Sequence, residues 1–171
     1  KLWCYKRGFL SFRIKQYGLT KDNYKSFLSD YQYHWLNRIN NSYQIWINDK
    51  TTTRYVFEPY KQYLAKYYYD IIKMQGQTCI KALQDIPEGF EASFDGIFKL
   101  LRQEKLLALK PSAGTHGDGF YRMEYADGKY LINGKEMTED EIVAMISGFK
   151  SIYVITEYLF MHHELKKIDR K

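Results

Sequence analysis

The sequence predicts an α+β fold in which a helical N-terminal segment precedes an antiparallel sheet with flanking helices. Apolar residues recur at helical spacing in the first 48 residues, and short runs of aromatic and branched side chains follow from about residue 67. The pairs Asp127-Gly128 and Asn133-Gly134 are typical of hairpin turns, which join antiparallel strands. Strands and helices do not alternate regularly, so we do not expect a doubly wound fold. We divide the chain into a helical segment, 1–48, and a sheet-containing region, 49–171.

Several helical pieces are expected in and just after the N-terminal segment. Thr20 precedes an apolar stripe, which predicts a capped helix over residues 21–28. Asp49 is positioned to cap a further helix that reaches Phe57. Pro59 limits this helix, because the residue before a proline avoids the helical conformation. Between these two helices the helical spacing continues at Tyr31, Trp35, Leu36 and Ile39.

The sheet-containing region shows strand and turn signals together with two capped helices. Ser93 is an N-cap candidate for a helix over Phe94–Glu104. Thr138 and Glu141 have the spacing of a capping box, which opens a helix that Gly148 ends. Strands are expected at 67–72, 78–80, 106–111, 120–125, 130–132 and 151–157.

The overall composition excludes several classes of protein. Hydrophobic residues make up 45% of the chain and charged residues 27%, which excludes wholesale disorder, collagen and a coiled coil. No apolar run approaches the roughly 18 residues that a membrane span needs. Cys4 and Cys79 are too few for a disulfide framework and form no Cys-x-x-Cys pair. We therefore expect free thiols and a cytoplasmic location.

Charge and tyrosine are concentrated in the first part of the chain. Residues 1–75 hold 13 of the lysines and arginines against 5 acidic residues, and 12 of the 17 tyrosines. This favours a partner that carries anions, such as phosphate, nucleic acid or lipid headgroups. A non-catalytic module that binds nucleic acid or anionic headgroups through Lys15, Lys21 and Lys25 is one hypothesis. The pattern does not favour nucleic acid, because no RNA-binding signature is present.

The segment from Leu106 to Phe120 is the strongest candidate for chemistry. A buried strand delivers a lysine, and a short loop with glycines and hydroxyl groups follows. Glycines let the backbone approach a ligand closely, and successive N–H groups can surround an anion. This is not a Walker A loop, because the lysine precedes the glycines. Phosphate binding and a plain glycine-rich hairpin fit this pattern equally. The candidate phosphate-binding residues are Lys110, Ser112, Gly114, Thr115, His116, Gly117 and Gly119.

The last predicted strand offers a second candidate. Its edge at Glu157, Tyr158, Leu159 and Phe160 can accept a flat ring such as adenine, although an ordinary core strand explains the same residues better when they are taken alone. The adjacent pair His162-His163 lacks the i, i+4 spacing of a zinc-binding helix, so we expect no metal site there.

Taken in order, several motifs resemble the ATP-grasp superfamily, and more narrowly its sugar-transfer-associated family, which is linked to bacterial surface polysaccharide gene clusters. The glycine loop at Lys110–Phe120 is similar to the family's phosphate-binding loop. Four further segments resemble family motifs: Trp46–Thr52 its Asp-Lys helix start, Pro59–Tyr69 its next block, Asp127–Lys135 its hairpin and Thr156–Leu159 its hinge. The segment His163–Ile168 looks like the start of the motif after that.

The resemblance implies a partial ATP-grasp fold over 49–171 and a role for each matching residue. Lys50 matches the lysine near the α-phosphate, and Lys110 matches the lysine between the α- and β-phosphates. The loop Ser112–Gly119 matches the flap that covers the β- and γ-phosphates. Glu157, with the backbone of Tyr158–Phe160, matches the edge that holds adenine.

The resemblance also implies an activity for a complete enzyme. ATP would phosphorylate a carboxylate, and an amine would attack the acyl phosphate, as in carboxylate–amine ligases that act in polysaccharide biosynthesis. The acceptor and donor are not identified. Family members hold Mg²⁺ with acidic and Asn side chains on later strands, so these ligands are expected beyond Lys171. We therefore expect this chain, by itself, to have little or no catalytic activity.

Overall fold

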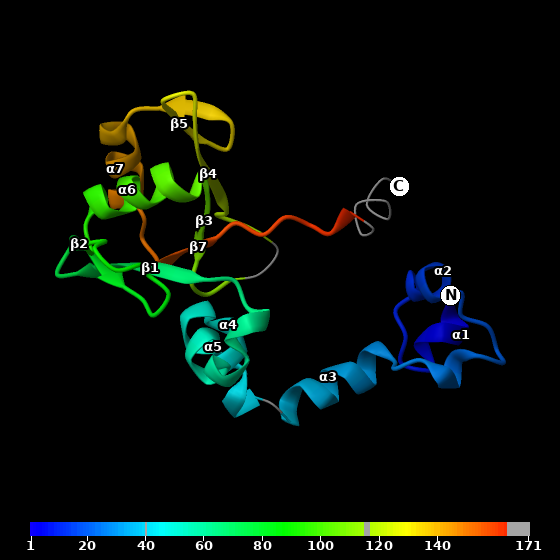
Figure 1. Ribbon diagram of the computed structural model, residues 1–171. Helices are drawn as coiled ribbons and strands as arrows, with labels where there is room; N and C mark the ends of the chain where they lie inside the picture. The colour runs from blue at the N-terminus through cyan, green and yellow to red at the C-terminus, as the bar shows by residue number, and fades with distance from the viewer. Residues whose placement is uncertain (40, 115–116, 164–171) are drawn as a thin grey trace. The chain divides into compact units, whose positions relative to one another are not determined.

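The computed structural model describes residues 1–39, 41–114 and 117–163, and these form two compact units. The N-terminal unit is Lys1–Ile45 and the sheet unit is Trp46–Lys171 (Figure 1). The architecture is α+β, as predicted: N-terminal helices precede a seven-stranded antiparallel sheet that is curled into a half-barrel and has flanking helices. Among the described helices, none combines the length and the apolar character needed to cross a bilayer.

The N-terminal unit is built from short helical pieces around a small core. Cys4, Phe9 and Leu19 are buried at its centre, and partly buried aromatic side chains that include Tyr24 and Phe27 pack against them. The helical pieces are α1 (Leu2–Tyr5), α2 (Arg13–Tyr17), η1 (Tyr24–Ser26), α3 (Asp30–Ile39) and η2 (Asn41–Tyr43).

One of the helix predictions for this unit is wrong. Residues 21–28 form a turn and the single 3₁₀ turn η1 rather than an α-helix. Thr20 Oγ1 accepts hydrogen bonds from the N–H groups of Asp22 and Asn23, both at 3.2 Å, and Asn23 Oδ1 accepts from the Thr20 N–H at 2.7 Å. These side chains satisfy the local backbone without a helix, which is how Thr and Asn compete with helical hydrogen bonding. The helical spacing up to Ile39 is confirmed as α3.

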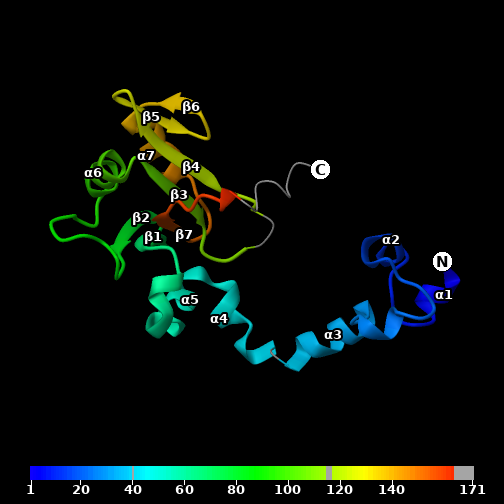
Figure 2. The ribbon, with the colours of Figure 1, turned by 45° about the vertical axis from the view of Figure 1, so that its right-hand side comes forward.

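The sheet unit is organised around one continuous antiparallel sheet, in the strand order β2-β1-β7-β3-β4-β5-β6 (Figure 2). The last strand in sequence lies between β1 and β3, so this placement joins distant parts of the chain. The strands are β1 (Tyr67–Met74), β2 (Gln77–Ala82), β3 (Leu106–Pro111), β4 (Tyr121–Ala126), β5 (Lys129–Ile132), β6 (Lys135–Met137) and β7 (Tyr153–Glu157). The helices are α4 (Ile45–Asn48), α5 (Lys50–Val56), η3 (Glu58–Tyr63), α6 (Phe94–Glu104) and α7 (Glu139–Ser147).

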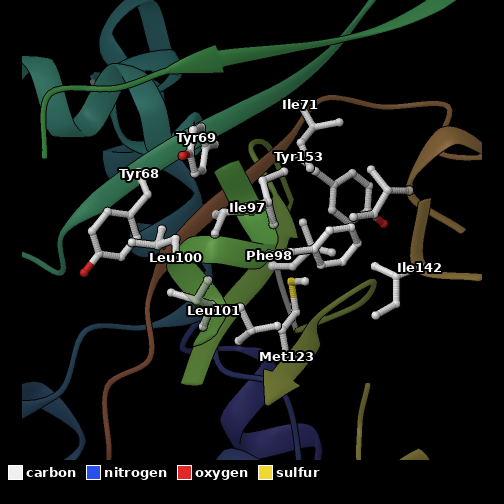
Figure 3. Packing of buried hydrophobic residues seen from close by; sticks show 14 of the residues in the cluster. Tyr68, Tyr69, Ile71, Ile97, Phe98, Leu100, Leu101, Met123, Ile142 and Tyr153 are labelled. Atoms are coloured by element: carbon white, nitrogen blue, oxygen red, sulfur yellow. The ribbon is translucent and has the colours of Figure 1, made fainter. Parts of the chain in front are cut away.

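One face of the sheet carries the main apolar core. Side chains of α6 and α7 pack there against alternate residues of the strands, as Figure 3 shows for Ile97, Phe98, Met123 and Ile142. Both helices begin as the sequence predicts. Ser93 Oγ accepts from the Gly96 N–H at 3.0 Å, and α7 opens with a complete capping box.

On the opposite side of β1, helix α5 is held by polar contacts. Asp49 caps it by accepting a hydrogen bond from the Thr52 N–H at 2.7 Å. Arg54 is buried, at 1% exposure, and its guanidinium donates to both carboxylate oxygens of Asp85 at 2.9 and 2.8 Å and to Glu58. Asp85 also accepts from the Tyr67 N–H at 2.8 Å, so one carboxylate joins α5 to the start of β1.

Replacing Asp85 with Asn is expected to lower the free energy of unfolding of the sheet unit by roughly 3–5 kcal/mol, because it leaves the buried Arg54 without its main counter-charge. Burial opposes ionisation of Asp85, but hydrogen bonds from Arg54 and the Tyr67 N–H outweigh it and hold its pKa below the ordinary value. The wild type therefore keeps this stabilisation above the ordinary carboxyl pKa and loses it as the pH falls towards the lowered one.

Urea denaturation across this pH range measures both effects. The matched control is Asp95→Asn on the exposed side of α6, which we expect to cost no more than the roughly 0.3–1 kcal/mol of a helix-terminal charge. Equal losses in the two variants would contradict the role given to Asp85.

Candidate functional site

The start of helix α5 is joined directly to the end of strand β3. The Lys50 N–H donates to the Ser112 carbonyl at 2.8 Å, and Asp49 forms an isolated β-bridge with Ala113. The Ser112 hydroxyl donates to the Asp49 carboxylate, which also caps the helix. These bonds bring together two segments that lie about 60 residues apart in the sequence and place Lys50 beside the glycine loop.

The Lys50 ammonium is fully engaged with this loop. Its Nζ donates to the carbonyl oxygens of Pro111 at 2.9 Å, Ser112 at 3.3 Å and Gly114 at 3.3 Å. An ammonium has three N–H donors, so each one has a partner. Lys50 therefore holds the loop in place here, and an anion that reaches Nζ must replace at least one of these carbonyls.

Lys110 approaches the same place from strand β3. Its Nζ lies 5.8 Å from the centre of the Tyr67 ring. Burial, and then the positive charge of Lys50, lower the pKa of Lys110. Among the described residues no carboxylate lies within ion-pair distance of its Nζ. A half-buried cation with no counter-ion is an environment that attracts an anion.

The two lysines line one small pocket of about 150 Å³. Its other walls are Pro111, Gly114, Gly117, Asp118 and Phe120. The sequence-based expectation that both cations converge thus agrees with the geometry. Asp118 adds a negative charge and is, among the described lining residues, the one that opposes an anion.

The glycine loop has the backbone that such a pocket requires. Gly114, Gly117 and Gly119 all have positive φ, at 142°, 78° and 73°. A Cβ on Gly119 would lie 2.7 Å from the Tyr153 hydroxyl, so only glycine fits there. The predicted site residues Thr115 and His116 lie outside the described residues, as does the motif His163–Ile168 beyond its first residue.

A buried polar network adjoins the pocket; the sequence analysis named its helix cap, Asp49, and Ser112, the latter as a phosphate-binding candidate, but not Thr51 or Asp70. Thr51 Oγ1 donates to Asp70 Oδ1 at 2.8 Å and lies 3.4 Å from the Ser112 hydroxyl. Burial raises the pKa of Asp70. Burial also opposes ionisation of Asp49, but hydrogen bonds from Ser112 and Thr52 outweigh it and lower its pKa. Asp70 lies in register with Val154, as does Lys110, but such pairing across a sheet leaves no signal in the sequence.

The predicted adenine edge is close to the pocket but does not line it. Glu157 pairs with Leu107, three residues along β3 from Lys110, which is roughly 10 Å of strand. Its carboxylate accepts from the Lys66 N–H at 3.2 Å, and its own N–H donates to the Lys66 carbonyl at 2.9 Å. The structure therefore ties this edge to the segment before β1.

The aromatic side chains after β7 connect this edge to the pocket. The Tyr158 ring lies 6.3 Å from the Phe120 ring and 5.2 Å from the Phe160 ring, and Arg122 lies over it at 5.8 Å. Phe120 also lines the pocket. Leu159 and Phe160 are 63% and 67% exposed. Phe120 lies at the end of the predicted candidate segment but was not named as a site residue, and Arg122 was predicted only as part of a strand.

Neutralising Lys50 is expected to raise the pKa of Lys110 towards the ordinary lysine value. The variant Lys50→Gln removes a positive charge close to Lys110 while it keeps two N–H donors for the loop carbonyls. Heteronuclear NMR titration of the lysine side chains measures the change, and Lys99→Gln on α6 is the control. Because burial remains, the pKa of Lys110 should stay below its ordinary value. An unchanged pKa would show that the two charges do not interact.

A search for metal-binding clusters and three comparisons with known proteins bear on chemistry and identity. Among the described residues no group of three or more His, Cys, Asp or Glu side chains is arranged to hold a metal ion. No model of a known protein family, no curated protein and no solved structure matches this chain.

Proposed function

We propose that the sheet unit binds ATP, with the phosphates in the pocket between Lys50 and Lys110. One observation carries the proposal: two half-buried lysines, both with pKa values that burial lowers, line the same small pocket together with glycines of positive φ. Two close cations oppose each other unless an anion lies between them. Phosphate oxygens satisfy both the ammonium groups and the backbone N–H groups of a glycine loop.

The size of the pocket limits what it holds. Its volume of about 150 Å³ is below the roughly 300–1,000 Å³ typical of complete ligand sites. The pocket therefore takes part of a triphosphate, and the base lies outside it. The aromatic group of Phe120, Tyr158 and Phe160 begins at the pocket wall, and Phe120 and Phe160 are exposed, so the group offers faces for stacking.

The motif order and the curled antiparallel sheet together favour a partial ATP-grasp fold. In that framework the complete enzyme is a carboxylate–amine ligase-like protein of bacterial surface polysaccharide biosynthesis. Mg²⁺ carried with the nucleotide neutralises phosphate charge in such chemistry. Asp118 at the pocket favours this Mg²⁺-bound form over the free nucleotide, because it repels uncompensated phosphate.

Binding of Mg-ATP tests the proposal. At a concentration about 100 times its dissociation constant, a ligand stabilises its folded site by about 2.7 kcal/mol. We expect a matching rise in the thermal unfolding midpoint of the sheet unit. Tryptophan fluorescence or circular dichroism measures this midpoint where the unfolding transition of the sheet unit is resolved. Isothermal titration calorimetry gives the affinity directly.

The decisive variant is Lys110→Ala, which should abolish the shift. Lys99→Ala, on α6, removes the same charge elsewhere and should leave the shift intact. Affinity should fall in the order ATP, ADP, AMP, because the pocket contacts phosphates. Binding that survives in Lys110→Ala, or that does not depend on the number of phosphates, would overturn the proposal.

A further inference from the structure

The N-terminal unit contains a second pocket, separate from the proposed ATP site. Its volume is about 520 Å³, within the range of small-molecule sites. Three cationic side chains line it, those of Lys6, Arg7 and Lys25. Aromatic side chains form much of the rest of its wall, including Tyr24 and Phe27.

This unit carries the entire net charge of the chain. Lys1–Ile45 contains eight lysines and arginines against two aspartates, whereas positive and negative residues balance in the remainder. One of the two aspartates, Asp30, accepts hydrogen bonds from Arg13 and from the Leu10 N–H. Among the described residues no carboxylate lies within ion-pair distance of the three cations of the pocket.

Arg7 is the best-positioned of these cations. Its guanidinium carbon lies 4.9 Å from the centre of the Trp3 ring and 4.8 Å from that of the Tyr24 ring. Its Nη1 donates to the Trp3 carbonyl at 3.2 Å. The two rings and this bond fix the plane of the guanidinium before any ligand arrives, so little conformational entropy is lost on binding.

The other edge of Arg7 lacks acceptors. Its Nε–H is buried and has no hydrogen-bond partner among the described residues, and no partner is found there for Nη2. The Nε and Nη2 hydrogens form the fork that binds two oxygens of one anion at once. A buried donor without a partner is costly, so a shift of side chains that brings an acceptor to Nε is favourable. The Trp3 Nε1–H is a second buried donor for which the described part of the chain supplies no partner.

The site depends on side chains and not on the start of helix α3. There Ser29 and Gln32 cap each other, with bonds of 2.9 and 3.2 Å, and the Tyr31 N–H donates to the Gly8 carbonyl. The helix donors are therefore already occupied.

We propose that this pocket binds the phosphate group of a small phosphomonoester, with Nη2 of Arg7 as the first donor to a phosphate oxygen, the buried Nε–H joining it once neighbouring side chains shift, and Lys6 and Lys25 neutralising the remaining charge. A dianionic phosphate matches three uncompensated cations better than a single carboxylate does. The pocket is larger than one phosphate, so the organic part of the ligand lies against the aromatic wall. The same group occurs in soluble phosphomonoesters and in the headgroup of phosphatidic acid, and the experiment separates these sources.

The test uses the full chain with Lys110→Ala as background, so that the proposed ATP site does not contribute. Phenyl phosphate and inorganic phosphate are titrated by calorimetry at low ionic strength. The variant Arg7→Lys keeps the positive charge but removes the paired Nε and Nη2 donors of the guanidinium. Its affinity for the phosphate probes should fall roughly ten- to a hundredfold. Lys25→Gln, at an exposed position of the rim, should weaken binding about two- to fivefold. The matched control Lys15→Gln, exposed on α2 outside the pocket, should leave it unchanged.

Vesicles of phosphatidylcholine with and without phosphatidic acid form the second arm. Binding to phosphatidic acid that Arg7→Lys and Lys25→Gln weaken, but Lys15→Gln does not, assigns the phosphate to the lipid headgroup. Absence of binding to every phosphate probe overturns the proposal. Equal losses in Lys25→Gln and Lys15→Gln also overturn it, because they indicate general attraction to a basic surface. These outcomes do not depend on whether the sheet unit binds ATP.

Discussion

The junction between helix α5 and the end of strand β3 decides where the candidate site lies. Closing a chain segment of about 60 residues carries an entropy cost that grows only slowly with length, so a few well-made bonds can hold it. Here Asp49 accepts hydrogen bonds from its own helix and from Ser112, while Lys50 bonds to the loop through both its backbone and its side chain. The same bonds that fix the loop also bring Lys50 towards Lys110. Without them the two cations would belong to unrelated surfaces.

Helix α5 is attached to the sheet unit mainly through polar contacts, and these contacts determine how precisely the helix is positioned. Thr51 bonds to Asp70 and Arg54 bonds to Asp85, whereas Tyr55 and Val56 remain 51% and 42% exposed. Apolar contacts tolerate small shifts, but hydrogen bonds weaken steeply when distance and angle change. A helix held by paired charges and hydroxyl groups is therefore fixed in rotation and register. That property suits an element whose first residue must meet a loop on another strand.

Features of the fold that depend on neighbouring residues could be predicted from the sequence. Features that depend on pairing between distant segments could not. Ser93, Thr138 and Asp49 each cap a helix as expected, because a cap depends on residues three positions away. The helix expected after Thr20 failed for an equally local reason, since Thr20 and Asn23 satisfy the turn between them. By contrast, the insertion of β7 between β1 and β3 depends on pairings across the whole unit. The position of Asp70 in the row that contains Lys110 follows from that insertion, and no sequence period encodes it.

The hydrogen bonds of Lys50 would couple the proposed phosphate binding to the position of the glycine loop. Its ammonium now donates to three neutral carbonyls of the Pro111–Gly114 segment. Hydrogen bonds to charged acceptors are roughly twice as strong as those to neutral ones, so a phosphate oxygen competes well for any of the three donors. Each exchange would remove a bond that holds the Pro111–Gly114 segment in its present place and would leave a carbonyl to find another donor. The glycines with positive φ allow the backbone to do so, since they accept changes that other residues resist. In the proposed ATP site, anion binding would therefore be coupled to rearrangement of the glycine loop through the hydrogen bonds of Lys50.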